Sequence, residues 1–554
     1  MKTLFFKPLL LLLLLLNLVL KVSAQVTLEG KQFKLNGNDF YPMVLCDIIE
    51  FAVDDSDPNN LLIFPGPHPQ MGVSFNYDSF NAQDAVQDIR NDMKRIKDLG
   101  FNCIRWTGMV PIYKTYCNKF YFQGATLSGA GTYNPLTTIP CTPQAVHNGP
   151  QYYLWVNSIS ASDPMIIAYF AAIDTILSIA AEPDIDLQVM IDFGYGDIAK
   201  STTAINDYST LLTLAAQHMV TAPHNDHFMA YIVVEEPLYT YDLAINNKQT
   251  ICDITNNWYN LIHTIDTGHL ISMSTYDVKE VIGWDPDVMR CDFLQPHFYP
   301  LRMPYETNAQ SGTDRVLGSI KWFSEHCPMP WMVGEAGLRA SDAWNSAAPN
   351  TLTLEGTEAE QVYFAQQTLS AVRDWGGSGY AWWNLQETWW TKEPFGIVKK
   401  ASPMWPPNSA DEKPVASIFR NYLNPTTHQP PAIGSSVLPS GFNPADPYDH
   451  NVPAAQLANT ISGTVIDQDG NPIENAVAVG ATYLEPNLNP LLDPIYDFHY
   501  VFTDNNGHFD IIPYDFSVDG YVEPMHGNVE MMQISASGAE RRFINELTPV
   551  WPGY

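Results

Sequence analysis

Helix-like and strand-like segments alternate along most of this chain, and no other feature of the sequence restricts the possible folds as much. Over residues 41–423, segments with apolar residues at helical spacing are followed by short apolar runs. In residues 84–99, for example, Val86 and Ile89 lie on the same predicted helix face, and Gly100 is placed to end that helix. A repeated helix–strand order is typical of a parallel β-sheet covered by helices.

The alternation predicts a specific number of strands. Counted from residue 41, eight are expected, at 41–47, 101–106, 187–193, 229–234, 270–274, 293–297, 330–333 and 379–383. The predicted helices are 84–99, 164–181, 209–222, 251–265, 315–326, 358–375 and 412–422. Eight such strands suit an α/β fold of the (β/α)8 TIM barrel type with insertions. A doubly wound open sheet is the alternative, but the chain lacks a Gly-rich phosphate turn.

Composition divides the chain into four parts. Residues 1–24 resemble a signal peptide, because a basic start, an apolar stretch of about a dozen residues and a small-residue cleavage site follow one another. That stretch is shorter than the roughly 20 residues of a membrane anchor, so we expect a secreted protein, extracellular or periplasmic. A barrel over 25–423 is then followed by a Pro/Ser/Asn-rich linker, 424–459, with few contacts. Alternating patterns predict a small all-β sandwich over 460–554.

The charge balance restricts the partners. The chain has 28 Lys and Arg against 60 Asp and Glu, a net charge of −32. Such a surface repels nucleic acid and anionic membranes and fits a monomer that acts on neutral material. None of the 7 Cys forms a Cys-x-x-Cys pair, so neither a metal site nor a cofactor is expected. Cys117 and Cys141 share one long insertion, 107–163, and are the predicted disulfide.

Two glutamates follow apolar runs at the points where predicted strands end. Glu236 lies in Tyr231-Ile-Val-Val-Glu-Glu-Pro237, and Glu335 lies in Trp331-Met-Val-Gly-Glu-Ala-Gly337. Two carboxyl groups at the same end of a barrel can face each other across a sugar, one protonating the leaving oxygen while the other attacks the anomeric carbon. Salt-bridged structural acids are the alternative interpretation. A secreted esterase or protease is disfavoured, because neither Gly-x-Ser-x-Gly nor His-Glu-x-x-His occurs.

Five short motifs resemble those of a known group of enzymes. They are Phe101-Asn-Cys-Ile-Arg105, Glu235-Glu-Pro237, His297-Phe-Tyr299, Gly334-Glu335 and Trp382-Trp383. They are similar to the strand-end motifs of glycoside hydrolase clan A, most of all to the cellulase and mannanase group of family 5. The resemblance covers roughly residues 30–423 and implies retaining hydrolysis of β-glycosidic bonds.

The resemblance also implies roles for individual residues. Glu236 is the expected acid/base and Glu335 the expected nucleophile, which Arg105 and Tyr299 orient. One tryptophan of the last strand is expected to form a sugar platform, and strand alternation lets only one of Trp382 and Trp383 point inward. The expected substrate-binding residues are Arg105, Trp106, Asp192, Glu235, His297, Tyr299, Trp382 and Trp383. For Trp106 and Asp192, packing is an equal alternative, as it is for Trp389 and Trp390 at outer subsites.

One position departs from the family pattern. The family has Asn immediately before the acid/base, where this chain has Glu235, which can accept but not donate a hydrogen bond to a sugar. The C-terminal part resembles the carboxypeptidase regulatory-like domain, an immunoglobulin-like sandwich. The sequence thus predicts a secreted retaining O-glycosyl hydrolase acting on a neutral poly- or oligosaccharide of β-glucan or mannan type. A non-catalytic glycan-binding or adhesion protein is the alternative, and the glycan, its linkage and endo or exo action stay open.

Overall fold

A computed structural model provides the structure of the chain. It describes residues 26–54, 57–65, 82–108, 110–114, 116–126, 146–148, 151–196, 198, 201–236, 248–278, 290–300, 309–340, 355–386, 394–399, 412–440, 442–443, 460–467, 469–483, 496–512 and 529–535. The predicted signal peptide and three residues named above, Cys141, Trp389 and Trp390, lie outside the described residues.

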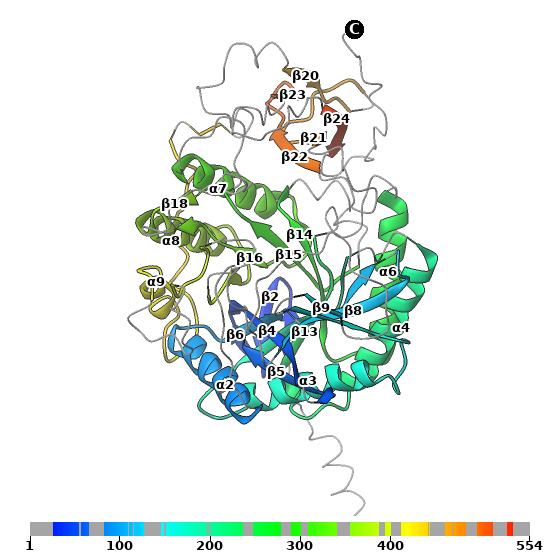
Figure 1. Cartoon of the computed structure of the whole chain (residues 1–554). Helices are drawn as coiled ribbons and strands as arrows, with labels where there is room; N and C mark the ends of the chain where they lie inside the picture. Colours follow the sequence, from blue (N-terminus) through cyan, green and yellow to red (C-terminus); the bar gives the residue numbers. More distant parts are fainter. Residues whose placement is uncertain are drawn as a thin grey trace, which may run out of the picture.

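Parallel strands form a barrel at the centre of the molecule (Figure 1). In spatial order they are β19 (Tyr380–Trp382), β4 (Met43–Asp54), β6 (Cys103–Thr107), β11 (Gln188–Asp192), β13 (Phe228–Val234), β14 (Leu270–Tyr276), β15 (Phe293–Phe298) and β16 (Glu335–Ala336). Backbone bonds from Val333 to Gly379 (3.1 Å) and from Trp383 to Ala336 (2.9 Å) bring the two end strands together. The barrel prediction is therefore confirmed, whereas an open doubly wound sheet would leave these ends apart.

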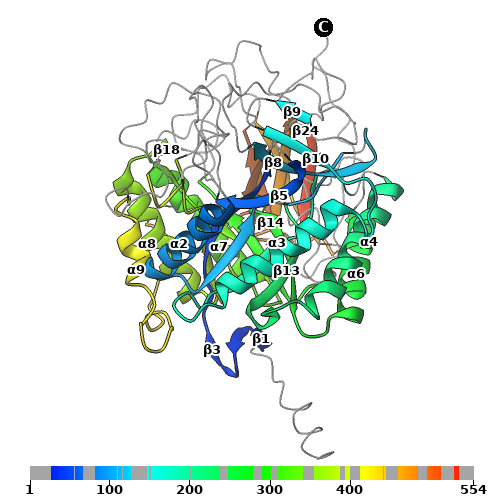
Figure 2. The same cartoon turned by 60° about the horizontal axis from the view of Figure 1, so that its bottom comes forward.

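Helices surround the barrel on the outside (Figures 1 and 2). They are α2 (Ala82–Asp98), α3 (Pro164–Ala180), α4 (Thr202–Met219), the short η1 (Asn225–His227), α6 (Lys248–Ile265), α7 (Ala309–His326), α8 (Glu358–Asp374) and α9 (Ala416–Arg420). The starts of two helices show why the sequence begins them there. Asp163 accepts the Met165 N–H at α3, and Thr357 and Glu360 form a reciprocal capping box at α8.

Apolar side chains form two layers separated by the strands. The larger core lies between strands and helices and includes Met43, Leu45 and Ile104. A smaller cluster fills the barrel interior and includes Val44 and Cys103, the alternate residues of the same strands. The hairpin strands β1 (Val26–Glu29), β2 (Gln32–Leu35) and β3 (Asn38–Phe40) contribute Val26, Phe33 and Phe40 to this interior cluster and close one end of the barrel (Figure 2).

Strand β4 extends beyond the barrel and carries a second group of strands. They are β5 (Asp57–Pro65), β7 (Ile112–Lys114), β8 (Lys119–Thr126), β9 (Val146–Asn148), β10 (Gln151–Trp155) and β12 (Tyr195–Gly196). Most of them belong to the long insertion that follows β6, so the insertion leaves the barrel at the carboxyl end of that strand, as expected. A separate pair, β17 (Arg339–Ala340) and β18 (Glu355–Gly356), follows β16. Cys117 in the insertion is disulfide-bonded, while the other described cysteines carry thiols rather than disulfides.

The described C-terminal residues form only strands. β20 (Ile461–Thr464) pairs with β23 (His508–Ile511), and β21 (Val477–Tyr483) lies between β22 (Tyr496–Phe502) and β24 (Val529–Ser535). All these pairings are antiparallel. Figure 1 shows this group beside α7, and we call it the C-terminal module.

The linker and the C-terminal module both contact the barrel domain, contrary to the expectation of few contacts. The Asp374 carboxylate, at the end of α8, accepts bonds from Gly434 N (2.8 Å) and Ser436 N (2.9 Å). Burial tends to raise the pKa of this carboxyl, but these bonds and the Arg373 guanidinium hold it well below its usual range. The Trp322 indole of α7 donates to the Asn475 carbonyl at 3.0 Å. Composition predicts where a linker lies but does not show which backbone groups find partners.

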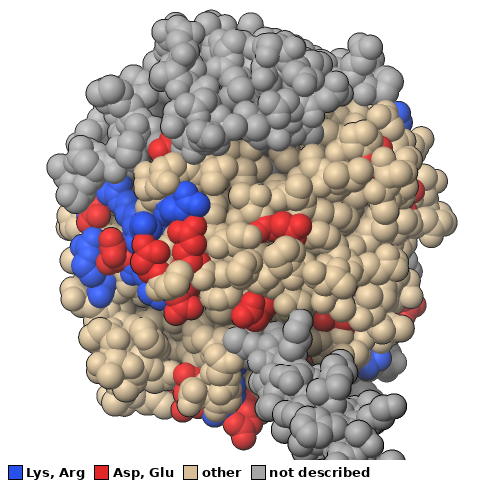
Figure 3. Space-filling view, turned by 90° about the horizontal axis from the view of Figure 1, so that it is seen from below, with Lys and Arg blue, Asp and Glu red and all other residues tan. Residues whose placement is uncertain are grey.

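Most basic side chains seen in Figure 3 gather in one region, where they alternate with acids. On α2, Arg90 pairs with Glu182 at 2.7 Å and Lys94 with Asp184 at 2.6 Å. These pairs leave little free positive charge there for an anionic partner. Among the helices described, none combines the length and the apolar character needed to span a bilayer.

Candidate active site

The polar residues at the centre of the barrel follow from strand alternation. Cys103 lies in the interior cluster, so Arg105, two residues later on β6, points inward one layer higher. The same step leads from Met190 to Asp192 on β11, and two such steps lead from Phe293 through Gln295 to His297 on β15. Polar side chains therefore replace apolar ones toward the carboxyl ends of the strands, where barrel enzymes place their active sites.

Arg105 is the charged centre of this layer, and only 1 % of it is exposed. Its Nη1 donates to Glu335 Oε1 at 2.7 Å, and its Nη2 donates to Asp192 Oδ2 at 3.2 Å and to Glu235 Oε2. Three carboxylates on different strands thus share one guanidinium, whose pKa their charges raise against the opposing effect of burial. The expectation that Arg105 orients Glu335 fits this geometry, and the Asp192 carboxylate accepts hydrogen bonds from the same guanidinium.

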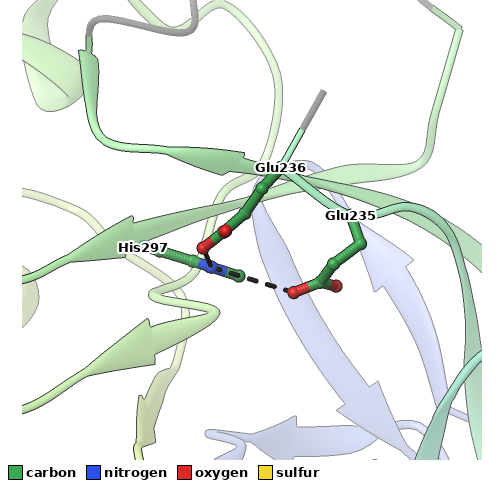
Figure 4. Close-up of side chains that lie close together, drawn as sticks. All are labelled: Glu235, Glu236 and His297. Atoms are coloured by element: carbon green, nitrogen blue, oxygen red, sulfur yellow. Dashed lines mark hydrogen bonds and ion pairs between the residues drawn. The ribbon is translucent and has the colours of Figure 1, made fainter. Parts of the chain in front are cut away.

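His297 connects Arg105 to Glu236. Its Nε2 lies 3.1 Å from Arg105 Nη1, and its Nδ1 lies 2.8 Å from Glu236 Oε1 (Figure 4). A guanidinium only donates, so Nε2 must accept and the ring proton sits on Nδ1, which donates to Glu236. Burial lowers the pKa of the imidazole, and the nearby Glu335 and Glu235 charges oppose that effect. The ring is therefore a neutral, oriented hydrogen-bond donor.

Glu335 is held on both of its oxygens. Oε1 accepts from Arg105, and Oε2 accepts the Tyr299 hydroxyl proton. Burial raises the pKa of this carboxyl, while His297 and Arg105 act in the opposite direction. The preceding Gly334 allows close packing of β16 on β15, since a Cβ there would lie 2.9 Å from His297 Cδ2. Close approach to a strand, rather than to a ligand, explains this glycine.

Glu236 adopts a backbone conformation that non-glycine residues rarely adopt, with a φ of 42°. Its N–H donates to Ser274 Oγ at 3.2 Å, which secures the turn at the end of β13. Strained backbone of this kind is enriched at functional sites. Because His297 Nδ1 lies 2.8 Å from Glu236 Oε1 and 3.6 Å from Glu335 Oε2, the two carboxylates face each other across one nitrogen.

Glu235, at the position where the family has Asn, points toward the same centre (Figure 4). Its Oε2 accepts from Arg105 and, at 3.3 Å, from Ser274 Oγ. Ser274 and Cys46 also belong to this site, although no pattern in the sequence pointed to them. Cys46 is a buried thiol whose pKa burial raises, and it lies close enough to Arg105 and Glu335 to respond to their charges. A serine and a cysteine on apolar strands give no signal of such neighbours in the sequence.

The aromatic residues separate into two groups. Trp383 packs with Tyr276, Tyr299 and Phe395 beside the glutamates and is only partly buried. Its neighbour Trp382 is fully buried, with ring centroids 5.0 Å from Phe419 among the helices outside the barrel. This placement corrects the expectation for Trp382, because alternation turns successive side chains of β19 to opposite faces.

Trp106 requires the same correction. It is 2 % exposed and packs against Tyr169 of α3, at a ring distance of 6.2 Å, on the outer side of β6. Its neighbour Arg105 occupies the inward position, so Trp106 cannot reach the same centre. Of the expected binding residues, Arg105, Asp192, Glu235, His297, Tyr299 and Trp383 gather with the two glutamates.

Glu235, Glu236 and His297 lie close enough together to share a cation. The proton on Nδ1 of the imidazole, which the Arg105 contact requires, is donated to Glu236 and occupies the position that a metal would take. The arrangement therefore fits two carboxyl groups beside a hydrogen-bonding histidine better than it fits a metal site.

Comparisons with known proteins give only distant likenesses. No family model and no curated protein sequence matches the chain. Similar solved structures include an exo-β-1,4-mannosidase from Opitutaceae bacterium strain TAV5, with 13% identity, a TM-score of 0.45, and coverage of 71% of this chain and 61% of that one. A GH2 β-galacturonidase from Eisenbergiella tayi has 16% identity, a TM-score of 0.39, and coverage of 72% and 53%.

A β-D-glucuronidase from Dictyoglomus thermophilum has 12% identity, a TM-score of 0.39, and coverage of 72% of this chain and 52% of that one. This chain thus spans between half and two thirds of the length of these glycosidases. All three TM-scores are below 0.5, so these likenesses assign no activity to this chain.

Proposed function

We propose that this protein is a β-glycoside hydrolase that works by double displacement, with Glu335 as nucleophile and Glu236 as acid/base. The observation that supports this most is the meeting of both carboxylates on His297 Nδ1, at 2.8 Å and 3.6 Å. Two such contacts keep those oxygens closer together than roughly 6.5 Å, the lower limit typical of inverting enzymes. The short separation supports a retaining mechanism.

The surroundings of the two carboxylates support different roles. Glu335, whose side chain is 9 % exposed, receives Arg105 and Tyr299 on separate oxygens, which fixes an ionised group for attack on the anomeric carbon. Glu236, 18 % exposed, is the more accessible of the two and can exchange its proton with water. This assignment agrees with the roles implied by the clan A resemblance.

The proposed reaction has two steps. Glu335 attacks the anomeric carbon while the bond to the leaving oxygen breaks, and Glu236 gives its proton to that oxygen. A water molecule then loses a proton to Glu236 and attacks the same carbon, which breaks the bond to Glu335 and restores both groups. Trp383, next to Tyr299, offers an aromatic face to the sugar ring.

We also propose that the substrate is a neutral β-glucan or mannan type glycan and that the protein acts outside the cytoplasm. The net charge of −32 supports a neutral substrate. The disulfide at Cys117 supports an oxidising compartment, as does the signal-like segment 1–24. Screening glycans and aryl β-glycosides for reducing-sugar or phenol release identifies the substrate.

Azide products test the two roles. With the nucleophile removed, Glu335→Gly should lose turnover, and azide should attack from the vacated face and give the α-glycosyl azide. Glu236→Ala should keep its first step on substrates with good leaving groups, and azide should then give the β-glycosyl azide from the covalent intermediate. The opposite pair of anomers would mean that the roles are reversed.

Glu358→Gln is a matched control, since Glu358 is as buried as Glu335 but pairs with Lys399 at the start of α8. It should retain turnover. Full activity of both site variants would refute the proposed mechanism. Specific glycan binding by a wild type that hydrolyses nothing would favour the non-catalytic alternative.

A further inference from the structure

We propose that Tyr500, in the C-terminal module, is a positioning residue of the candidate active site. It acts through Asp277, whose backbone holds the carbonyl of His297. The inference rests on the function proposed above as far as catalysis is concerned, but its structural part concerns only the orientation of His297.

Tyr500 connects the module to the end of a barrel strand. It is 2 % exposed, and its hydroxyl donates to Asp277 Oδ2 at 3.0 Å. Because that donation uses the only hydroxyl proton, Ser319 Oγ of α7, 2.5 Å away, must be the donor to the Tyr500 oxygen. A buried tyrosine with both hydrogen-bonding positions used is fixed in orientation, and its removal leaves polar groups without partners.

Asp277 follows directly after β14 and needs this support. Its φ of 61° lies in the left-handed region, which is unfavourable for a non-glycine residue. One carboxylate oxygen accepts the Val278 N–H at 2.7 Å, and the other accepts Tyr500. The side chain is thus tied on both oxygens, which holds the backbone in its unusual conformation.

The backbone of Asp277 contacts the site directly. Its N–H donates to the His297 carbonyl at 2.9 Å, where β14 and β15 end side by side. The preceding Tyr276 lies opposite His297 in the strand pairing, and its ring centroid lies 6.1 Å from that of Tyr299. A shift of Asp277 therefore reaches both residues that hold the two glutamates, since His297 donates to Glu236 and Tyr299 to Glu335.

A purely adhesive role for this contact is the simpler explanation, and the interface supplies a control for it. Trp322 of α7 donates to Asn475 O at 3.0 Å and stacks on Phe502 at 6.2 Å. The single N–H of Trp322 is donated to Asn475, so this pair fastens the same module to the same helix without a hydrogen bond from Trp322 to Asp277. If the module only adds stability, Tyr500 and Trp322 should behave alike.

The experiment compares Tyr500→Phe with Trp322→Phe in the full chain. Each change keeps a ring and removes one buried donor, so both should lower the melting temperature by similar amounts. Tyr500→Phe should also lower kcat by about 10-fold, with KM changed less than 2-fold, and shift the pH profile of kcat, as expected for loss of a supporting hydrogen bond. Trp322→Phe should change neither kcat nor the pH profile.

A double-mutant cycle tests whether Asp277 carries the effect. Asp277→Asn keeps a side chain that tolerates the left-handed conformation but weakens the bond to Tyr500. The effects of Tyr500→Phe and Asp277→Asn on kcat should be clearly non-additive. Additive effects would show that Tyr500 acts by another route and would overturn the inference.

A readout without turnover separates this inference from the proposed function. In protein labelled with 13C at histidine Cε1, the His297 signal, assigned with His297→Gln, should change its shift and titration in Tyr500→Phe but not in Trp322→Phe. Absence of hydrolysis by the wild type would refute the proposed function. The comparison of the His297 signal in the two variants would then still test whether Tyr500 orients His297. An unchanged His297 signal in Tyr500→Phe would overturn the inference.

Discussion

Two buried aspartates between β4 and α2 make the stability of this protein depend on pH in an unusual direction. Asp47 and Asp92 are 1 % and 2 % exposed, and one oxygen of each has no hydrogen-bond partner among the residues that the structure describes. Burial raises the pKa of Asp47 from 3.8 to about 7, and burial together with the Asp47 charge raises the pKa of Asp92 well above its usual value. Both carboxyls are therefore stable in the fold only while protonated.

The magnitude follows from the pKa of Asp47. In the unfolded chain its pKa is near 3.8, so the folded state binds the extra proton between that pH and about 7. Stability from this group is complete below pH 3.8 and is lost as the pH rises through 7. A rise of about three pKa units corresponds to roughly 4 kcal/mol. Asp47→Asn removes the ionisation, so the variant should gain this amount relative to the wild type at pH 8 and little at pH 4.5.

Thermal unfolding by calorimetry between pH 4.5 and 8 measures the effect. About 1 kcal/mol shifts the melting temperature by roughly 2–4 °C in a domain of 150–250 residues and by less in a larger one. The difference in melting temperature between the variant and the wild type should thus increase by several degrees from pH 4.5 to pH 8. Asp98→Asn, an exposed change at the end of the same helix, is the control and should give a flat difference. If the difference in melting temperature between Asp47→Asn and the wild type stays constant, or becomes smaller toward pH 8, the proposed effect of Asp47 on stability is refuted.

Three further experiments test the site and its surroundings. Tyr299→Phe removes a donor to the proposed nucleophile and should lower kcat on an aryl β-glycoside by about 10–100-fold, whereas Tyr380→Phe, a buried strand tyrosine bonded to a helix residue, should not. Trp383→Ala should raise KM in the same assay, while Trp382→Ala should cost about 3–5 kcal/mol of stability in denaturant unfolding, since only the latter fills the core. Cys117 should resist thiol labelling in the native protein, as mass spectrometry of its peptide will show, and its labelling without reductant would contradict the disulfide.

Which residues of each strand face the candidate site could be predicted from the sequence, because side chains along a strand alternate with a period of two. Once Phe101–Trp106 is accepted as a strand, Cys103 and Arg105 must share a face, and the same holds for residues 295 and 297. The choice between Trp382 and Trp383 was not determined in this way. It depends on the register of β19 against β4, which pairs Trp382 with Leu45 on the outer face.

Contacts between distant parts of the chain could not be predicted from the sequence. Asp277 and Tyr500 are separated by 223 positions, and neither lies in a motif. Asp374, which fixes the linker, resembles any acid at a helix end. Such polar pairs depend on the exact docking of two surfaces, whereas periodic patterns depend only on local geometry.

Glu235 stands where the clan A pattern, which five motifs of this chain resemble, has Asn, and it brings a third carboxylate to Arg105. Arg105 also binds Asp192 and Glu335, so three carboxylates share one guanidinium. In a buried site an excess of negative charge is relieved by retaining a proton, and burial together with the Glu235 charge raises the pKa of Asp192 against the opposing effect of Arg105. A double displacement also needs one proton held between two carboxyls, which Glu236 must deliver. Glu235 thus makes it more favourable for the site to retain a proton. Glu235→Gln removes this negative charge and should make proton retention less favourable, while the amide oxygen still accepts a hydrogen bond from Arg105.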